Sequence, residues 1–363
     1  MNISWLVNQN ICTEQSEGRS MFGYLKKEYP SLRMDIMDGE KLNGNRIPRP
    51  SIRLQFDKIF RWTNYRNYLN YLWIKKHRVD ILHIYHSYLF RKILNMLDIK
   101  NRPKIVITLH GSDSYIRPWT NNDWNKFYAI HSKNIEAFIT FSQNQKEYLN
   151  RWGLPLDKIH VVPPGSPFQK AIPIKRKLNN SIKLISAFRL SWHKNLLGHL
   201  NFIKELKNHF DEVQYHVFGG GYEEEIAQFY YLADKLQITD IVKYKGNIEN
   251  DLLLNKMQEY DFLLHLSISE SIATSIVEAQ SRGLIPIVSN VGGLGEVVNH
   301  METGFIREFD NFEGFLNDIN YLRFDSNRYA TMSENCINNF TKYYTTEIVS
   351  NKIMDIYKHI LSL

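Results

Sequence analysis

Short apolar runs alternate with segments of helical periodicity along most of the chain. The runs read as near-continuous apolar sequence, which is typical of parallel strands that are covered on both faces. Alternation of such strands with helices predicts two doubly wound, parallel α/β sheets. The predicted strands span residues 2–8, 80–85, 104–109, 136–141, 158–163, 182–186, 215–219, 241–246, 262–267 and 285–289.

Length and composition favour two domains. A chain of 363 residues exceeds what one hydrophobic core usually supports, and its 43% hydrophobic residues are enough for substantial cores. Residues 163–180 carry prolines, polar residues and a charge run without helical periodicity, as expected at a boundary. We predict a first Rossmann-like domain over 1–170, a linker over 171–180, a second Rossmann-like domain over 181–341 and a C-terminal amphipathic segment over 342–363.

Residues 261–297 are the most informative segment. A buried strand is predicted from Asp261, and small side chains follow it before a helix that Thr274 or Ser275 could cap. The free N–H groups and the dipole of that helix would suit a diphosphate at the carboxyl edge of the sheet. Glu278 has two open interpretations, because Ser275-x-x-Glu278 is also a capping box.

Glu270 is harder to explain structurally. A carboxylate at the strand tip would repel a phosphate unless it hydrogen-bonds an uncharged group such as a sugar hydroxyl. The acids and glycines of this segment resemble the donor-site signature of glycosyltransferase family 4, whose members are retaining enzymes of the GT-B fold. The resemblance is carried by Glu270, Glu278, Ala279, Gly283, Pro286, Gly292, Gly293 and Glu296.

The resemblance assigns roles to this segment. It implies that Glu270 holds donor-sugar hydroxyls and Glu278 the ribose hydroxyls, and that the final helix crosses back to the first domain. Ser271 stands where the family mostly has glycine, and Ile272-Ala273 where an aromatic residue or glycine is common. These three residues and Thr274 are expected to bind the donor through the backbone that follows Glu270.

Two cations follow the strand at 182–186. Arg189 and Lys194 resemble the R-x4-K pair with which the family grips the donor diphosphate. The structural alternative is an exposed pair of charges. Because Lys194 is expected in the first turn of a helix, where a cation opposes the macrodipole, an anionic ligand would offset that cost, and we favour the functional interpretation.

A glycine run at 219–221 superficially suggests a phosphate loop. The three glutamates at 223–225 already complement the helix dipole and would repel phosphate, so we reject that interpretation. By resemblance, Gly219 and Gly220 form a tight turn near the base or ribose. The segment after the next strand resembles the family's nucleobase contact, which places Gly246, Asn247 and Ile248 near the base.

The first half contributes a weaker motif. The strand at 104–109 delivers His110-Gly111-Ser112-Asp113 to the edge where open α/β sheets bind ligands. The motif resembles the family's H-G-x-D element, which puts His110 beside the anomeric carbon and makes Asp113 a candidate for orienting the acceptor. An ordinary turn or helix cap is the alternative for Asp113. His83 and His86 are predicted to be packing or turn residues.

The loop after the first strand has only one glycine, Gly18, where the family has a glycine pair. We expect residues 10–18 to face the cleft, and whether they contact acceptor or phosphate stays open. Gly18 is accordingly a candidate acceptor contact.

Charge is unevenly distributed. Residues 1–180 hold 29 Lys and Arg against 14 Asp and Glu, whereas the remainder holds 16 against 24. Basic and aromatic residues interleave over 53–78, a mixture that adsorbs to anionic bilayers. An amphipathic helix that packs its aromatics on the first sheet is the alternative, and both can hold together. Nucleic acid is disfavoured as a partner, because no helix-turn-helix, zinc-finger or RNA-recognition signature occurs.

The remaining features bear on location. Cys12 and Cys336 fall in different predicted domains, which fits a reducing compartment. No signal-peptide pattern or run of 18 apolar residues occurs, so a cytoplasmic protein, peripheral on the inner face of the membrane, is expected.

The sequence therefore predicts retaining transfer of a hexose from a nucleotide-diphosphate sugar, with UDP favoured, to a saccharide or lipid-linked acceptor. No D-x-D triplet occurs, so we expect no metal or other cofactor, with Arg189 and Lys194 neutralising the leaving diphosphate. By resemblance His110 lines the reaction centre. A GT-B-like subunit without catalytic activity and a GT-B nucleotide-sugar epimerase are the alternatives.

Overall fold

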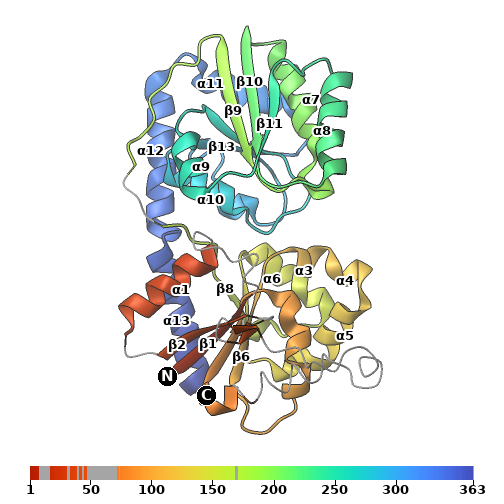
Figure 1. Ribbon diagram of the computed structural model, residues 1–363. Helices are drawn as coiled ribbons and strands as arrows, with labels where there is room; N and C mark the ends of the chain where they lie inside the picture. Colours follow the sequence, from red (N-terminus) through yellow and green to blue (C-terminus); the bar gives the residue numbers. More distant parts are fainter. Residues whose placement is uncertain are drawn as a thin grey trace. The chain divides into compact units, whose positions relative to one another are not determined.

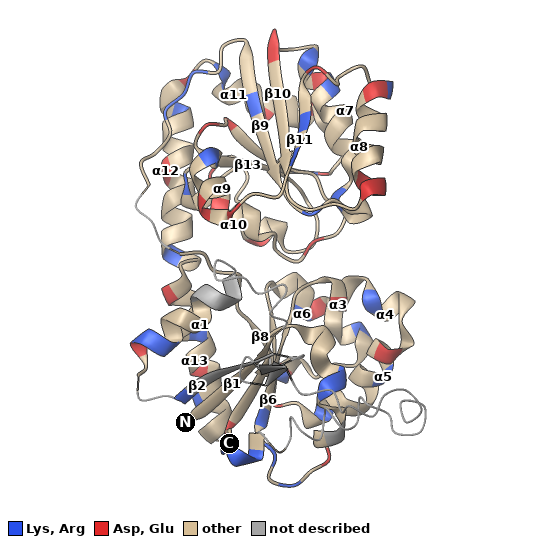
Figure 2. Cartoon of the chain, viewed as in Figure 1, with Lys and Arg blue, Asp and Glu red and all other residues tan. Residues whose placement is uncertain are grey.

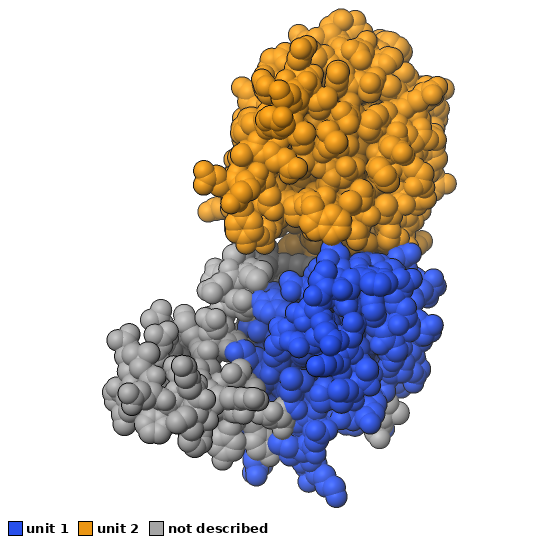
Figure 3. Space-filling model, turned by 90° about the vertical axis from the view of Figure 1, so that its right-hand side faces the viewer, with its two compact units in different colours: residues 1–163, 349–363 blue, residues 164–348 orange. Residues whose placement is uncertain are grey.

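The computed structural model describes residues 1–7, 17–30, 33–38, 41–42, 45–46, 72, 74–167 and 171–362. The chain divides into two compact units, Met1–Pro163 with Val349–Leu363, and Pro164–Ile348 (Figures 1 and 3). Each unit is built on a six-stranded, fully parallel sheet. The prediction of two doubly wound parallel sheets is confirmed.

The first sheet has the strand order β2-β1-β5-β6-β7-β8. The chain reverses its direction of travel across the sheet between β1 and β5, so the topological switch point lies there. Its strands are β1 (Asn2–Val7), β2 (Arg33–Asp38), β5 (Ile81–Ile84), β6 (Lys104–Leu109), β7 (Ala137–Thr140) and β8 (Ile159–Val161), and a short hairpin pairs β3 (Lys41–Leu42) with β4 (Asn45–Arg46).

Helices cover both faces of this sheet. One apolar cluster joins the sheet to α1 and α13, and the other joins it to η1, α5 and α6. The helices are α1 (Glu17–Glu28), η1 (Ser87–Lys92), η2 (Leu94–Met96), α3 (Ser112–Tyr115), α4 (Arg117–Thr120), α5 (Asn122–His131), η3 (Ser132–Asn134), α6 (Gln143–Leu149), η4 (Asn150–Trp152), η5 (Leu156–Lys158) and α13 (Thr346–Ser362).

His83 shows how the C-terminal helix is attached. Its Nδ1 lies 2.5 Å from the Tyr357 hydroxyl of α13, and its Nε2 lies 2.7 Å from Thr108 Oγ1 on β6. Complete burial lowers the pKa of His83 to about 3, so the imidazole is neutral. The prediction that His83 is a packing residue is confirmed, because it links two strands to a helix in the interior.

The second sheet has the order β11-β10-β9-β12-β13-β14, with its switch point between β9 and β12. Its strands are β9 (Ser181–Ala187), β10 (Glu212–Phe218), β11 (Val242–Gly246), β12 (Phe262–His265), β13 (Ile285–Ser289) and β14 (Phe305–Arg307). The helices are η6 (Trp192–Lys194), α7 (Leu196–Lys207), α8 (Glu223–Lys235), α9 (Asn250–Met257), α10 (Thr274–Ser281), η7 (Leu294–Glu296), α11 (Phe312–Arg323) and α12 (Ser326–Tyr343).

The units divide earlier than the linker expected at 171–180. The segment after Pro163 already pairs within the second unit, since Ser166 forms a parallel bridge with Thr345. Farther on, Ile174 N donates to Ser333 Oγ at 2.7 Å and Leu178 N donates to Arg323 O at 3.1 Å. Residues 171–180 therefore pack along the second unit.

Some sequence predictions fall outside the described residues. Of the basic-aromatic stretch 53–78, only residue 72 and residues 74–78 are described, and the loop at 8–16 and Cys12 are not. Cys336 is buried on α12. Among the described residues, no helix combines the length and apolarity that a bilayer span requires.

Candidate functional site

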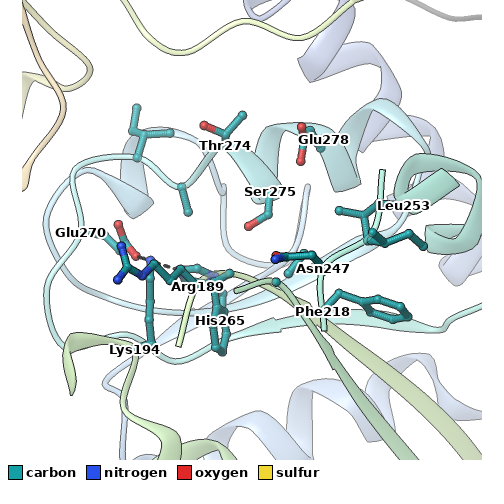
Figure 4. Close-up of a pocket in the computed structure, with 16 residues that line it drawn as sticks. Arg189, Lys194, Phe218, Asn247, Leu253, His265, Glu270, Thr274, Ser275 and Glu278 are labelled. Carbon is teal, nitrogen blue, oxygen red and sulfur yellow. Dashed lines mark hydrogen bonds and ion pairs between the residues drawn. The ribbon is translucent and has the colours of Figure 1, made fainter. Parts of the chain in front are cut away.

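A cavity of about 440 Å³ opens at the carboxyl ends of β9, β10 and β12, beside the switch point of the second sheet (Figure 4). Ten of the residues predicted from the sequence line it, namely Arg189, Lys194, Gly219, Asn247, Ile248, Glu270, Ile272, Ala273, Thr274 and Glu278. The remaining lining residues were not predicted, namely Ala187, Phe188, Phe218, Leu253, His265 and Ser275. One concave site therefore gathers segments that are up to about ninety residues apart in sequence.

The turn that carries Lys194 is fixed to the neighbouring strand. Asn195 caps α7 in the left-handed conformation (φ 53°), where its Oδ1 accepts from Gly198 N at 3.2 Å and its Nδ2 donates to Leu266 O at 3.0 Å. Lys194 thus precedes the cap, and the expectation that it lies in the first helical turn was wrong. Ile268 N also donates to His193 O at 2.9 Å, so η6 and the exit of β12 hold one another in place.

Lys194 and Glu270 form an ion pair in the cavity, with both side chains 12% exposed. The same oxygen, Glu270 Oε1, also lies 3.1 Å from His265 Nε2 and 3.3 Å from Ser267 Oγ. Burial lowers the pKa of Lys194 to about 8. The ammonium is therefore costly to keep charged, and an anionic ligand would stabilise it.

The backbone at Glu270 packs against the glycine pair Gly292-Gly293. Gly292 has φ +54°, and a Cβ there would lie 1.7 Å from Glu270 O. Gly293 N donates to Ser271 O at 2.8 Å. Ser271 itself is buried and, unlike its neighbours Glu270 and Ile272, does not line the cavity.

Helix α10 points its first turn at the cavity without a side-chain cap. Its N-cap is Ala273, and Ser275 lies inside the helix, so the proposed Ser275-x-x-Glu278 capping box is wrong. Glu278 Oε1 instead accepts from Asn250 Nδ2 at 3.0 Å. Burial raises the pKa of Glu278, because the charged carboxylate is removed from water. A polar ligand that donates hydrogen bonds would relieve that cost.

The glycines at 219–221 serve close packing. Gly219 has φ +126°, and a Cβ there would lie 2.1 Å from Phe188 O. Gly220 O accepts from Leu190 N at 2.7 Å. Gly220 lies next to the Asn247 side chain, but it does not line the cavity. These contacts place the glycine turn beside Asn247.

The acids that follow the glycine run complement their own helix. Three glutamates form the first turn of α8 (Figure 2), and Glu225 Oε2 accepts from Tyr222 N at 2.7 Å. The Arg189 guanidinium lies 4.7 Å from the centre of the exposed Tyr222 ring. Arg189 thus lines the cavity with an aromatic ring beside its guanidinium.

In the first unit, the Asp113 carboxylate accepts hydrogen bonds within the turn after β6 and from η1. It accepts from His110 N at 2.8 Å, Gly111 N at 2.9 Å and Ser87 Oγ at 2.5 Å, and it is 2% exposed. This is the turn alternative left open by the sequence. Asp113 organises the backbone that presents His110, and its oxygens are already engaged.

His110 stands at the end of β6 among other aromatic rings. Its Nε2 donates to Tyr85 O at 2.6 Å, and its ring stacks on His86 with centroids 5.8 Å apart. Burial lowers its pKa, so the imidazole is neutral. Gly18 lies in α1, and the loop before that helix is outside the described residues.

Two family models match consecutive parts of the chain. The family model described as glycosyl transferases group 1 matches residues 168–339, and the model described as Glycosyltransferase Family 4 matches residues 30–169.

Two curated relatives are similar over most of the chain. N-acetyl-alpha-D-glucosaminyl L-malate synthase of Bacillus anthracis is 23% identical, with 79% of this chain and 76% of the relative covered. UDP-Gal:alpha-D-GlcNAc-diphosphoundecaprenol alpha-1,3-galactosyltransferase of Escherichia coli is 26% identical, with 79% and 77% covered.

Solved structures are similar in fold over nearly the full length. A glycosyltransferase from Rickettsia africae superposes with a TM-score of 0.76 at 19% identity, covering 99% of this chain and 98% of that one. Anabaena HepE in complex with UDP and glucose gives a TM-score of 0.74 at 13% identity, covering 98% and 99%. The similarity to these structures, together with the two parallel α/β units of this chain, confirms the predicted GT-B fold.

Proposed function

Since this chain belongs to glycosyltransferase family 4 and has the GT-B fold of enzymes that act on nucleotide sugars, we propose that it transfers a hexose to a saccharide or lipid-linked saccharide. The proposed donor is a UDP-sugar, and the proposed reaction retains the configuration at the anomeric carbon. Synthesis of a surface polysaccharide or glycolipid is the proposed setting, at the cytoplasmic face of a membrane. The named substrates of the Escherichia coli relative, a UDP-sugar and a lipid diphosphate saccharide, support this choice.

One observation carries the proposal. Arg189, Lys194 and the uncapped first turn of α10 converge on a single cavity at the carboxyl edge of the second sheet. Two side-chain cations and a helix N-terminus together complement a diphosphate, which is the leaving group of a nucleotide-sugar transfer. In this proposal the protein's own cations stabilise the departing group, and no metal or cofactor takes part.

The two acids fit the two ends of the donor. Glu270 lies beside Lys194, where the sugar would follow the diphosphate, and its carboxylate would accept from sugar hydroxyls. Glu278 lies beside Asn250 farther along the cavity, where it would accept from ribose hydroxyls. Asn247 and Ile248 are the proposed contacts to the base.

The proposed reaction needs no protein nucleophile. The bond between the anomeric carbon and the diphosphate oxygen breaks, and the acceptor hydroxyl attacks from the face that the diphosphate leaves. The hydroxyl proton passes to a diphosphate oxygen. Arg189 and Lys194 stabilise the negative charge that develops on that leaving group, and the neutral His110 is proposed to line the reaction centre.

The test compares Lys194→Ala with the control Lys204→Ala, which removes an exposed lysine from α7 outside the cavity. With a panel of UDP-, GDP- and ADP-sugars and a lipid-linked saccharide, we expect Lys194→Ala to lower transfer by at least about a hundredfold and Lys204→Ala to leave it unchanged. Circular dichroism should show both variants folded. Wild-type turnover by Lys194→Ala would contradict the proposal.

The same assay separates the alternatives. An epimerase would convert the donor sugar without an acceptor, and a non-catalytic subunit would bind UDP but turn over no donor. Product analysis by NMR would show whether the new linkage keeps the anomeric configuration of the donor.

A further inference from the structure

Glu270 uses its two carboxylate oxygens differently. Oε1 receives Lys194 Nζ, His265 Nε2 at 3.1 Å and Ser267 Oγ at 3.3 Å, whereas no residue in the described ranges donates a hydrogen bond to Oε2. A carboxylate oxygen with three donors is saturated. Oε2 is therefore the atom that is left for a ligand.

His265 is an unusual residue for its position. It ends β12, whose other residues are Phe262, Leu263 and Leu264, and all four are completely buried. The Phe188 ring packs against the imidazole with centroids 5.5 Å apart. A leucine would suit this apolar strand better, because burying an imidazole costs free energy unless its nitrogens are hydrogen-bonded.

The hydrogen bonding of His265 defines its tautomer. The carboxylate can only accept, so Nε2 carries the proton and Nδ1 does not. Nδ1 is buried and has no hydrogen-bond partner among the described residues. Burial and the nearby Lys194 hold the pKa of His265 well below its usual range, so the ring is a neutral donor. An unsatisfied buried nitrogen of this kind calls for an explanation outside packing.

We propose that His265 is a positioning residue for the donor sugar, which fixes the Glu270 carboxylate so that Oε2 accepts from a sugar hydroxyl. This inference rests on the proposed function, because it requires a nucleotide sugar in the cavity. Donor binding changes the contacts of Lys194. A flexible lysine that grips the diphosphate is shared with that anion, and Glu270 then keeps the two donors that are anchored on β12 and the residues after it, His265 and Ser267.

The proposal separates the sugar end of the donor from the nucleotide end. A residue that acts through Glu270 should matter when the ligand carries a sugar, and should not matter for UDP alone. A residue that only supports the fold would affect both ligands together. UDP and the UDP-sugar that the wild type turns over are therefore the two probes.

The experiment titrates both probes into the wild type, His265→Leu and His265→Gln by calorimetry. Leucine fills the apolar site without a donor, whereas the glutamine amide restores an N–H near the position of Nε2. We expect His265→Leu to bind UDP within about twofold of the wild type but to lose about tenfold to a hundredfold in affinity and kcat/KM for the UDP-sugar. His265→Gln should recover most of that loss.

Several outcomes would overturn the inference. Equal losses for UDP and UDP-sugar in His265→Leu would assign a structural role, as would a loss that glutamine does not rescue. Unchanged sugar binding in His265→Leu would remove the role altogether. The pH profile of kcat/KM gives one more such outcome. If kcat/KM of the wild type falls as the pH is lowered between about pH 7.5 and 5.5, and His265→Gln does not show this fall, the imidazole is a proton-transfer group instead. If the wild type binds neither probe, the proposed function itself fails, which is a different result from loss in the variants alone.

Discussion

Gly292→Ala tests how the donor-site backbone is built. Gly292 has φ +54°, and the added Cβ would lie 1.7 Å from Glu270 O. Side-chain carbons essentially never come within 3.0 Å of such an atom, so the Glu270 carbonyl must move by more than about 1 Å. Because the 270–271 backbone is tied to the glycine pair by the bond from Gly293 N to Ser271 O, the displacement would pass into the loop that carries the Glu270 side chain.

The magnitude follows from geometry. A left-handed conformation costs a non-glycine residue about 1–2 kcal/mol, which a domain of this size tolerates. A misplacement of about 1 Å in a catalytic group can cost about a hundredfold in rate. We therefore expect Gly292→Ala to stay folded, and to lose about a hundredfold in kcat/KM for the donor.

Gly295→Ala is the matched control. A Cβ at Gly295 would first meet Ile306 Cδ1 at 3.4 Å, the far end of a flexible side chain. The two variants would be compared by thermal unfolding and by initial rates over a range of donor concentrations. Equal activities for Gly292→Ala, Gly295→Ala and the wild type would refute the reasoning, because the Glu270 backbone would then tolerate displacement.

Three further predictions use pH and single substitutions. Because Lys194 has a pKa of about 8 and must be charged to bind an anion, UDP affinity should be constant below about pH 8 and fall by up to about tenfold per pH unit above it, as measured by calorimetry. Lys194→Arg should remove this fall, and a flat profile in the wild type would contradict the assignment. Glu278→Ala should weaken UDP binding by about tenfold or more, while Glu278→Gln, which keeps an acceptor for Asn250, should lose less; an equal loss in both variants would contradict this, because a neutral acceptor would then be unable to replace the carboxylate. Asp113→Ala should lower the free energy of unfolding of the first unit by about 2–5 kcal/mol in urea denaturation and leave UDP affinity unchanged, and a stable variant would show that the turn does not depend on the carboxylate.

The fold was predictable because its central strands are apolar on both faces. The runs at 182–186 and 262–267 contain most of β9 and β12; β12 is completely buried, and in β9 the residues Ile182, Leu184, Ile185 and Ser186 are buried. Two edge strands were missed. In β2, Arg33–Asp38, three charged residues interrupt the apolar ones, and β14, Phe305–Arg307, has only three residues, so neither shows an apolar run.

Site residues could be predicted where a charged side chain directly follows a buried strand. They could not be predicted where the role of a residue comes from its hydrogen bond to an acid. Arg189, Lys194 and Glu270 each follow a buried strand, so the topology brings them to one edge. Asn250 and His265 were missed, because their roles come from contacts with acids 28 and 5 residues away that no local pattern records.

Local motifs also misled where backbone conformation decides. The capping-box spacing of Ser275 and Glu278 is real, but a cap needs a non-helical backbone and Ser275 lies within α10. Lys194 likewise fell outside its helix, because Asn195 takes the left-handed conformation and starts α7 one residue later. A one-residue shift in a helix boundary thus changes the role of a side chain.

The most direct test of the central claim is a crystal structure of the wild-type protein with UDP bound. The account predicts the diphosphate in the cavity of the second unit, within hydrogen-bonding distance of Arg189, Lys194 and the first N–H groups of α10. UDP bound at another place, with that cavity occupied only by solvent, would contradict it.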